Sequence, residues 1–200
     1  MDIVLATGNA GKVRELRAML AGTPYRIIPQ AEFACPEVAE TGLSFVENAL
    51  IKARHAALHT GLPAIADDSG LACEALQGAP GIYSARYAGI GAGDAANMAK
   101  LLATLQPVPR AARGCRFICV MVYVAHAADP FPVIAQGVWD GWVAHVPRGT
   151  QGFGYDPIFE VPETDLTAAE LAPARKHAMS HRGIALTELV KQLAARHAGH

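Results

Sequence analysis

Apolar and polar positions along the chain predict strands that interleave with helices. The predicted strands are the short apolar runs, at residues 3–6, 25–28, 64–67, 116–125 and 133–139. Apolar residues at helical spacing predict helices over residues 11–21, 45–59, 94–105, 167–171 and 181–196. The last two strands follow each other without a helix, so we expect them to pair antiparallel. The pattern therefore predicts an α/β fold with a mixed sheet and flanking helices.

The helix over 45–59 has a clear start and two distinct faces. Ser44 and Glu47 match the capping-box signature, which predicts the amino end of this helix. One stripe is apolar and consists of Val46, Leu50, Ala53 and Ala57. The opposite stripe is polar and consists of Asn48, Lys52, His55 and His59. By itself this second stripe predicts a solvated face, and the two histidines lack the acidic third ligand that a zinc site would need.

Composition narrows the class of protein. The chain has 200 residues, 52% of them hydrophobic, which predicts a single domain with a full core. Its net charge of −1 and the lack of any long run of like charges argue against nucleic-acid or membrane partners. The four cysteines include no Cys-x-x-Cys pair, and the start of the chain lacks a secretion signal. We therefore expect a cytoplasmic protein with free thiols.

A glycine-rich turn at residues 7–12 follows the first predicted strand. A Walker loop would need glycine where Ala6 stands and Ser or Thr where Val13 stands, so this turn is not one. An ordinary tight turn would explain Gly8 and Gly11. It would not explain Lys12 at a helix start, where the macrodipole disfavours a cation unless an anion is bound. We interpret the turn as a phosphate site that offers Lys12 and free backbone N–H groups.

Two adjacent carboxylates, Asp67 and Asp68, stand at the end of the predicted strand 64–67. Adjacent strand residues point to opposite faces, so one carboxylate can face a ligand while the other braces the turn. A carboxylate beside a triphosphate can hold Mg²⁺ or a water, and Glu40 is the natural second metal ligand. The alternative is a polar loop in which one aspartate caps the next turn.

Two further blocks combine groups that could hold a nucleoside. Phe153 could stack on a flat base within Phe153–Asp156, although a buried loop aromatic is an equal alternative. Ser180 precedes the last predicted helix, and His181 and Arg182 place two donors at its positive end. Cations at that position favour an acceptor-rich partner such as a phosphate or a base carbonyl.

In combination, these blocks resemble the inosine/xanthosine triphosphate pyrophosphatase family. Six blocks stand in the family's order over essentially the whole chain, at residues 5–12, 40–49, 66–71, 78–87, 152–159 and 180–183. The resemblance implies an elongated mixed sheet with flanking helices, forming one domain (residues 1–200) of two lobes with a nucleotide cleft between them. It also implies a homodimer and Mg²⁺-dependent hydrolysis of ITP, dITP and XTP to the monophosphate and pyrophosphate.

The resemblance also implies a role for each candidate residue. Asp68 would be the general base, and Glu40 and Asp68 the metal carboxylates. The phosphate-binding residues would be Thr7, Gly8, Asn9, Ala10, Gly11, Lys12 and Lys52. The nucleoside-binding residues would be Ser69, Phe153, Gly154, Tyr155, Asp156, Lys176, His181 and Arg182. A donor such as Arg182 facing the 6-oxo group would reject adenine, whereas guanine must be excluded at position 2.

Two other interpretations stay open at this point. The Maf-like pyrophosphatases are thought to share the architecture while acting on other nucleotides, although the blocks at 153–156 and 181–182 argue against them. A nucleotide-binding regulator without turnover is the alternative outside enzymes. The presence of Glu40, Asp68 and Lys12 together argues against that interpretation.

Overall fold

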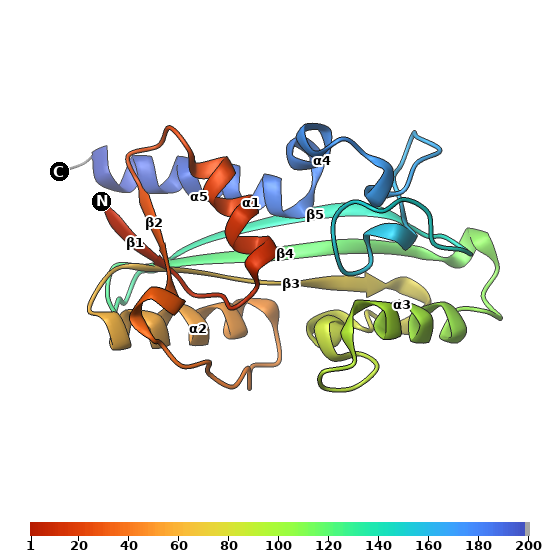
Figure 1. Ribbon diagram of the computed structural model, residues 1–200, viewed down its shortest axis with the longest axis horizontal. Helices are drawn as coiled ribbons and strands as arrows, with labels where there is room; N and C mark the ends of the chain where they lie inside the picture. Colours follow the sequence, from red (N-terminus) through yellow and green to blue (C-terminus); the bar gives the residue numbers. More distant parts are fainter. Residues whose placement is uncertain (199–200) are drawn as a thin grey trace. The chain divides into compact units, whose positions relative to one another are not determined.

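The computed structural model describes residues 1–198 of the chain. The strands form one six-stranded mixed sheet (Figure 1). Its strands, in chain order, are β1 (Asp2–Leu5), β2 (Arg26–Pro29), β3 (Ala64–Cys73), β4 (Gly114–Val124), β5 (Val133–Val143) and β6 (Phe159–Glu160). The spatial order is β2-β1-β3-β4-β5-β6. Strand β1 pairs parallel with β2 and β3, whereas β5 pairs antiparallel with β6. The mixed α/β fold is therefore confirmed.

The helices are α1 (Ala10–Leu20), α2 (Phe45–Thr60), α3 (Gly93–Thr104), α4 (Pro173–Met179) and α5 (His181–Ala198). The start of α2 follows from a cap that the sequence encodes. The Ser44 hydroxyl accepts a hydrogen bond from the Glu47 N–H, and the Glu47 carboxylate accepts one from the Leu43 N–H. The Ser44 contact satisfies the Glu47 N–H, which the first turn of α2 leaves without a helical partner, and the Glu47 contact ties down the residue before the cap. The predicted start of α2 is confirmed.

Three elements differ from the sequence expectation. Strand β3 continues to Cys73, so Asp67 and Asp68 lie inside it and not in a turn at its end. The helix expected over 167–171 is a short 3₁₀ turn at residues 168–170, and α4 begins directly after it at Pro173. Proline suits the first position of a helix because its missing N–H would have no helical partner there. Strand β6 is two residues long, too short for an alternating pattern to reveal.

The chain divides into two units. Unit 1 comprises residues 1–68, 119–137 and 182–200, of which 199–200 lie outside the described part. Its core joins α1 and α5 to the strands through side chains such as Leu16, Ile65, Met121 and Leu189. In this unit α2 lies on the opposite face of the sheet from α1 and α5 (Figure 1). Alanines on α2, among them Ala49 and Ala53, are fully buried, which permits close helix–sheet packing.

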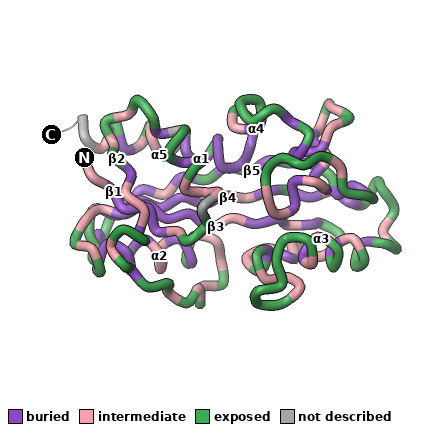
Figure 2. The backbone as a smooth tube through the Cα atoms, in the orientation of Figure 1, coloured by how far each residue is buried: buried purple, intermediate pink, exposed green. Residues whose placement is uncertain are grey.

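Unit 2 comprises residues 69–118 and 138–181. Its core contains an aromatic cluster in which the Phe117 ring centroid lies 4.6 Å from that of Phe159. Leu101 of α3 and Leu105, the residue after its end, also belong to this core and are fully buried. Buried positions lie along the strands in both units (Figure 2). Within residues 1–198, no helix is long and apolar enough to cross a membrane. The prediction of a single domain stays a prediction.

Asp129 organises the loop between β4 and β5, and we expect its removal to destabilise unit 1. Its carboxylate accepts hydrogen bonds from the Ala125 and Phe131 N–H groups, each at 2.9 Å, and from Arg196 at 3.1 Å. Burial alone would raise the pKa of Asp129, but these donors lower it below the ordinary 3.8. Asp129→Ala should lower the free energy of unfolding at pH 7 by about 2 kcal/mol, measured by urea denaturation.

The pH dependence of that difference follows from the lowered pKa of Asp129. A depressed folded pKa contributes stability that is present above the unfolded pKa and lost as pH falls through the folded pKa. The gap between wild type and Asp129→Ala should therefore shrink as pH is lowered below 3.8. Asp140→Ala is the control, because that carboxylate is largely exposed, and it should change nothing measurable. An equal effect of both variants would contradict the assignment.

Candidate functional site

Asp67 and Asp68 contact different cations, as their opposite directions in β3 predict. The Lys12 ammonium lies 2.7 Å from Asp67 Oδ2, and Arg182 Nη2 lies 3.9 Å from the same oxygen. The Lys52 ammonium lies 3.3 Å from Asp68 Oδ1. Asp67 is buried completely, whereas the Asp68 side chain retains 8% exposure. Asp67 is thus enclosed with its cations, and Asp68 is the more accessible of the two carboxylates.

The charged cluster around Asp67 and Asp68 also includes Lys52, which therefore does not lie on a solvated helix face. Its ammonium lies 2.7 Å from Glu40 Oε1 as well as 3.3 Å from Asp68 Oδ1, and its side chain is only 16% exposed. The expectation of a solvated polar stripe on α2 was therefore wrong for Lys52. The contacts place the carboxylates of Glu40 and Asp68 around one common cation. Lys52 is on α2, Asp68 is on β3 and Glu40 is in the segment before α2, so residues separated in the sequence come together in the fold.

The charges of this cluster shift the pKa of its members in different directions. Burial by itself would raise the pKa of Asp67, but Lys12, Arg182 and Lys52 hold it well below its usual range. Burial raises the pKa of Asp68, and Lys52 offsets this only in part while Glu40 adds to it. Burial alone would lower the pKa of Lys52, yet the surrounding carboxylates raise it. Asp67 is thus held ionised, and Asp68 is the more basic of the two aspartates.

The turn at 7–12 differs from the expected cradle of free amides. Asn9 caps α1, and its Oδ1 accepts hydrogen bonds from the N–H groups of Gly11 at 2.8 Å and Lys12 at 3.1 Å. The Asn9 N–H itself donates to Thr7 Oγ1 at 3.2 Å. The expectation of free amides was therefore wrong for these three positions. The charged group that this turn contributes to the cluster is the Lys12 ammonium, which contacts Asp67.

In unit 2, Asp156 organises the loop that contains Phe153. Its Oδ2 accepts hydrogen bonds from the Phe153 N–H at 2.8 Å and from the Lys176 ammonium at 2.7 Å. The Lys176 ammonium also lies 5.7 Å from the centre of the Phe153 ring. Gly152 has φ +82°, and a Cβ there would lie 2.1 Å from Asp156 Oδ2, so only glycine fits. Asp94 accepts from the Gly154 N–H at 2.7 Å.

Tyr155 and His181 are buried among the residues of unit 2. The Tyr155 hydroxyl donates to the Ser84 carbonyl at 2.8 Å, and burial raises the pKa of Tyr155. The His181 ring stacks on Phe117 with centroids 4.7 Å apart. Their side chains therefore support the fold of this unit.

The predicted site residues divide between the two units. Unit 1 contains Thr7, Gly8, Asn9, Ala10, Gly11, Lys12, Glu40, Lys52, Asp68 and Arg182. Unit 2 contains Ser69, Phe153, Gly154, Tyr155, Asp156, Lys176 and His181. Sequence reasoning missed Asn48, whose amide donates to Asp68 Oδ2 at 3.2 Å. Its position four residues before Lys52, on the same face of α2, was the signal that could have identified it.

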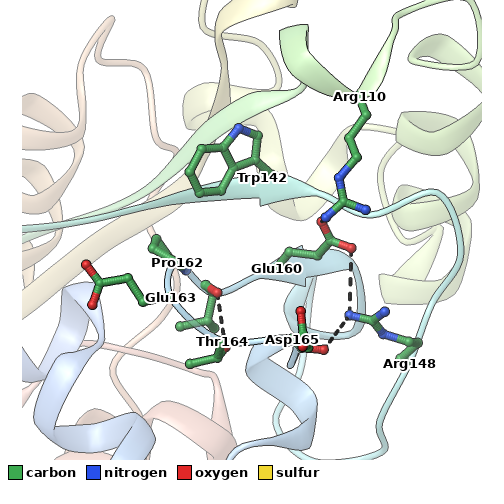
Figure 3. Close-up of a pocket in the computed structure, with 9 residues that line it drawn as sticks. Arg110, Trp142, Arg148, Glu160, Pro162, Glu163, Thr164 and Asp165 are labelled. Atoms are coloured by element: carbon green, nitrogen blue, oxygen red, sulfur yellow. Dashed lines mark hydrogen bonds and ion pairs between the residues drawn. The ribbon is translucent and has the colours of Figure 1, made fainter.

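A separate pocket of unit 2 has a volume of about 210 Å³ (Figure 3). Arg110, Trp142, Arg148 and the segment 160–165 line it, and no predicted site residue is among them. The Arg110 guanidinium lies 3.1 Å from Glu160 Oε2, and that of Arg148 lies 3.7 Å from Glu160 Oε1. These cations already face a carboxylate, so we interpret the pocket as a surface ion-pair network.

Glu40 and Asp68 fit a magnesium ion better than a transition metal. Among residues 1–198, no group of three His, Cys, Asp or Glu side chains could hold a metal ion. Magnesium is usually held by one or two carboxylates together with water and substrate phosphates, so it needs no third protein ligand. Both carboxylates contact the Lys52 ammonium, so their oxygens lie close to one common position. The four cysteines are free thiols, and all are buried.

Comparison with known proteins places the chain in a family. The model of the Ham1 family matches residues 3–192. The chain belongs to the Ham1 family. A protein of Thioalkalivibrio sulfidiphilus named dITP/XTP pyrophosphatase is 62% identical over 196 residues, covering 98% of this chain and 100% of that protein. A Yersinia pseudotuberculosis protein of the same name is 59% identical over 191 residues, covering 96% of this chain and 97% of that protein.

Solved structures of similar proteins have the same fold. A Ham1 protein from Coxiella burnetii matches with a TM-score of 0.91 and 50% identity, over 98% of this chain and 99% of that one. A nucleoside-triphosphatase, dITP/XTP pyrophosphatase, from Mycobacterium abscessus matches with a TM-score of 0.76 and 44% identity, over 96% and 100% of the two chains. The resemblance inferred from the sequence motifs is therefore confirmed at the level of family and fold.

Proposed function

We propose that this Ham1 protein hydrolyses dITP, ITP and XTP to the nucleoside monophosphate and pyrophosphate, which removes deaminated purines from the nucleotide pool. Relatives up to 62% identical carry the name dITP/XTP pyrophosphatase. The observation that carries the proposal is the cluster in unit 1, where Lys52 contacts Glu40 and Asp68 while Lys12 contacts Asp67. Cations beside an ordered carboxylate pair are what metal-assisted hydrolysis of a triphosphate requires.

Asp68 is the proposed general base. It retains exposure to solvent, and burial raises its pKa, so it is a better proton acceptor than a free aspartate. Lys12 and Lys52 would stabilise the negative charge that develops on the leaving pyrophosphate. Asp67 keeps Lys12 oriented, at 2.7 Å. Glu40 and Asp68 would hold Mg²⁺, whose charge lowers the pKa of bound water and neutralises phosphate oxygens.

Base recognition is proposed for the Phe153 loop. Phe153 offers a ring for stacking, and Asp156 and Lys176 fix the position of that ring. Inosine and xanthosine differ from adenine by a 6-oxo group, so a donor facing that position would exclude adenine. One buried polar group without a partner costs about 1–3 kcal/mol, which corresponds to roughly ten- to hundredfold discrimination.

The test is a comparison of kcat/KM for dITP, XTP, GTP and ATP with the purified protein and Mg²⁺, following pyrophosphate release. We expect dITP and XTP to exceed ATP and GTP by at least about tenfold, as one unpaired buried group predicts. Binding of nucleotides without release of pyrophosphate would favour a regulator and overturn the proposal.

Phe153→Ala should raise KM for every purine triphosphate by about tenfold while leaving base preference unchanged. Stacking on an aromatic ring contributes about 1–3 kcal/mol per base and is tolerant of base identity. The measurement is KM for dITP, XTP and ATP. Tyr83→Ala is the control, because that ring is 53% exposed and outside the Phe153 loop. A collapse of the dITP-to-ATP ratio in Phe153→Ala would show that the ring selects the base.

Three further proposals extend the resemblance. We propose Mg²⁺ as the cofactor, a homodimer as the active form and the cytoplasm as the location. Removal of divalent ions with EDTA should abolish turnover, and excess Mg²⁺ should restore it. Light scattering coupled to gel filtration should give twice the mass of the 21.0 kDa chain. A fully active monomer, or activity that persists in EDTA, would refute the corresponding proposal.

A further inference from the structure

Asn48 connects the backbone of the segment that carries Glu40 to the carboxylate of Asp68 through a pair of hydrogen bonds. Its Oδ1 accepts from the Gly42 N–H at 2.9 Å, two residues after Glu40 in the chain. Its Nδ2 donates to Asp68 Oδ2 at 3.2 Å. The side chain is fully buried on α2, so packing fixes its orientation. One rigid amide therefore spans the segment that carries Glu40 and the strand that carries Asp68.

The surrounding structure leaves this amide little freedom. A Cβ at position 42 would lie 2.8 Å from Asn48 Oδ1 and 2.5 Å from the Glu47 Cβ, so glycine permits the turn to approach α2. Lys52, one helical turn further along α2, contacts Asp68 through Oδ1. Asn48 and Lys52 thus bind different oxygens of Asp68, which fixes the rotation of that carboxylate.

We propose that Asn48 is a positioning residue for the Glu40–Asp68 pair, setting the separation and orientation of the two carboxylates that receive the divalent cation. The inference rests on the proposed function and adds to it a residue that touches neither substrate nor metal. An amide is suited to this task because it provides one donor and one acceptor in a planar group. Partners that orient ligating carboxylates typically affect metal affinity or activity by 10–100-fold when they are removed.

The test uses Asn48→Leu, which keeps the number and branching of the side-chain heavy atoms and removes both hydrogen bonds. Binding of Mn²⁺ alone, followed by loss of the free-ion signal in electron paramagnetic resonance, reports on the site without turnover. Mn²⁺ prefers the same oxygen ligands as Mg²⁺. We expect the Kd for Mn²⁺ to rise by about tenfold or more, and kcat for dITP to fall more strongly than KM rises.

Asn97→Leu is the matched control in unit 2. Asn97 is also buried, its Oδ1 accepts from the Ala88 N–H at 2.7 Å and its Nδ2 donates to the Ala85 carbonyl at 3.1 Å. This variant should lose stability to a similar extent but bind Mn²⁺ like the wild type. If Asn48→Leu does not fold, Asn48→Ser removes the same amide, leaves room for water and carries the same expectation.

Two outcomes would overturn the proposal. A folded Asn48 variant with the Kd for Mn²⁺ and the kcat of the wild type would show that the amide does not position the pair. Equal weakening of Mn²⁺ binding by the Asn97 control would show a general effect of destabilisation. Failure of the proposed function would be distinguishable, because the wild type would then release no pyrophosphate from dITP whatever the variants bind.

Discussion

Asp68→Asn should lower kcat for dITP by about 10²–10⁴-fold while the protein still binds the nucleotide. The substitution keeps the volume of the side chain but removes the proton acceptor, and general-base catalysis contributes that range. It also removes one of the two carboxylates near Lys52, so its effect exceeds that of any single phosphate contact. The measurement is pyrophosphate release at saturating dITP, with nucleotide binding followed separately by calorimetry.

A matched control separates the loss of a general base from any general effect of replacing an aspartate. Asp140→Asn changes an exposed carboxylate of β5 in unit 2 and should keep the wild-type rate. If Asp68→Asn keeps more than about a tenth of the wild-type kcat, Asp68 is not the general base.

Asp67→Asn should destabilise the protein by about 3 kcal/mol. Asp67 is completely buried and lies 2.7 Å from the Lys12 ammonium, whose side chain is 15% exposed. Removing one partner of a buried ion pair typically costs 3–5 kcal/mol because the other charge stays behind in the protein interior. We place the loss near the lower end because Lys12 keeps some access to water. The free energy of unfolding is measured by chemical denaturation.

A double-mutant cycle tests the cause of that loss. Lys12→Met in the Asp67→Asn background removes the charge left behind and should recover part of the stability. Glu32→Gln is the control, because it breaks an exposed ion pair: the Glu32 side chain is 60% exposed and that of Arg17 is 49% exposed. We expect no measurable change in its free energy of unfolding. If Asp67→Asn unfolds at the same denaturant concentration as the wild type, the ion pair does not stabilise the fold.

Local signals predicted those parts of the fold that depend on neighbouring residues. The Ser44-x-x-Glu47 signature predicted the start of α2 because the hydrogen bonds of this cap join residues within four positions of each other. The sequence did not predict the extension of β3 through Asp67 and Asp68. These buried carboxylates are stable in a strand only because Lys12 and Lys52 face them. That compensation comes from helices distant in sequence, and a local pattern cannot contain it.

The candidate site was predictable as a set of residues and not as a set of contacts. Motifs identified Lys12, Glu40 and Asp68, but the position of Lys52 between two carboxylates depends on tertiary packing. Asn48 was assigned to a solvated stripe because helical periodicity records which face a residue is on and not what covers that face. Arg182 lies near Asp67 in the structure, and its contact with the base stays a prediction.

The position of bond cleavage tests the central claim most directly. Incubation of the purified protein with dITP and Mg²⁺ in ¹⁸O-labelled water should yield dIMP and pyrophosphate, with the label in dIMP, because water attacks the α-phosphorus. Mass spectrometry of both products measures this. Formation of dIDP and labelled orthophosphate, or label in the pyrophosphate, would contradict the account.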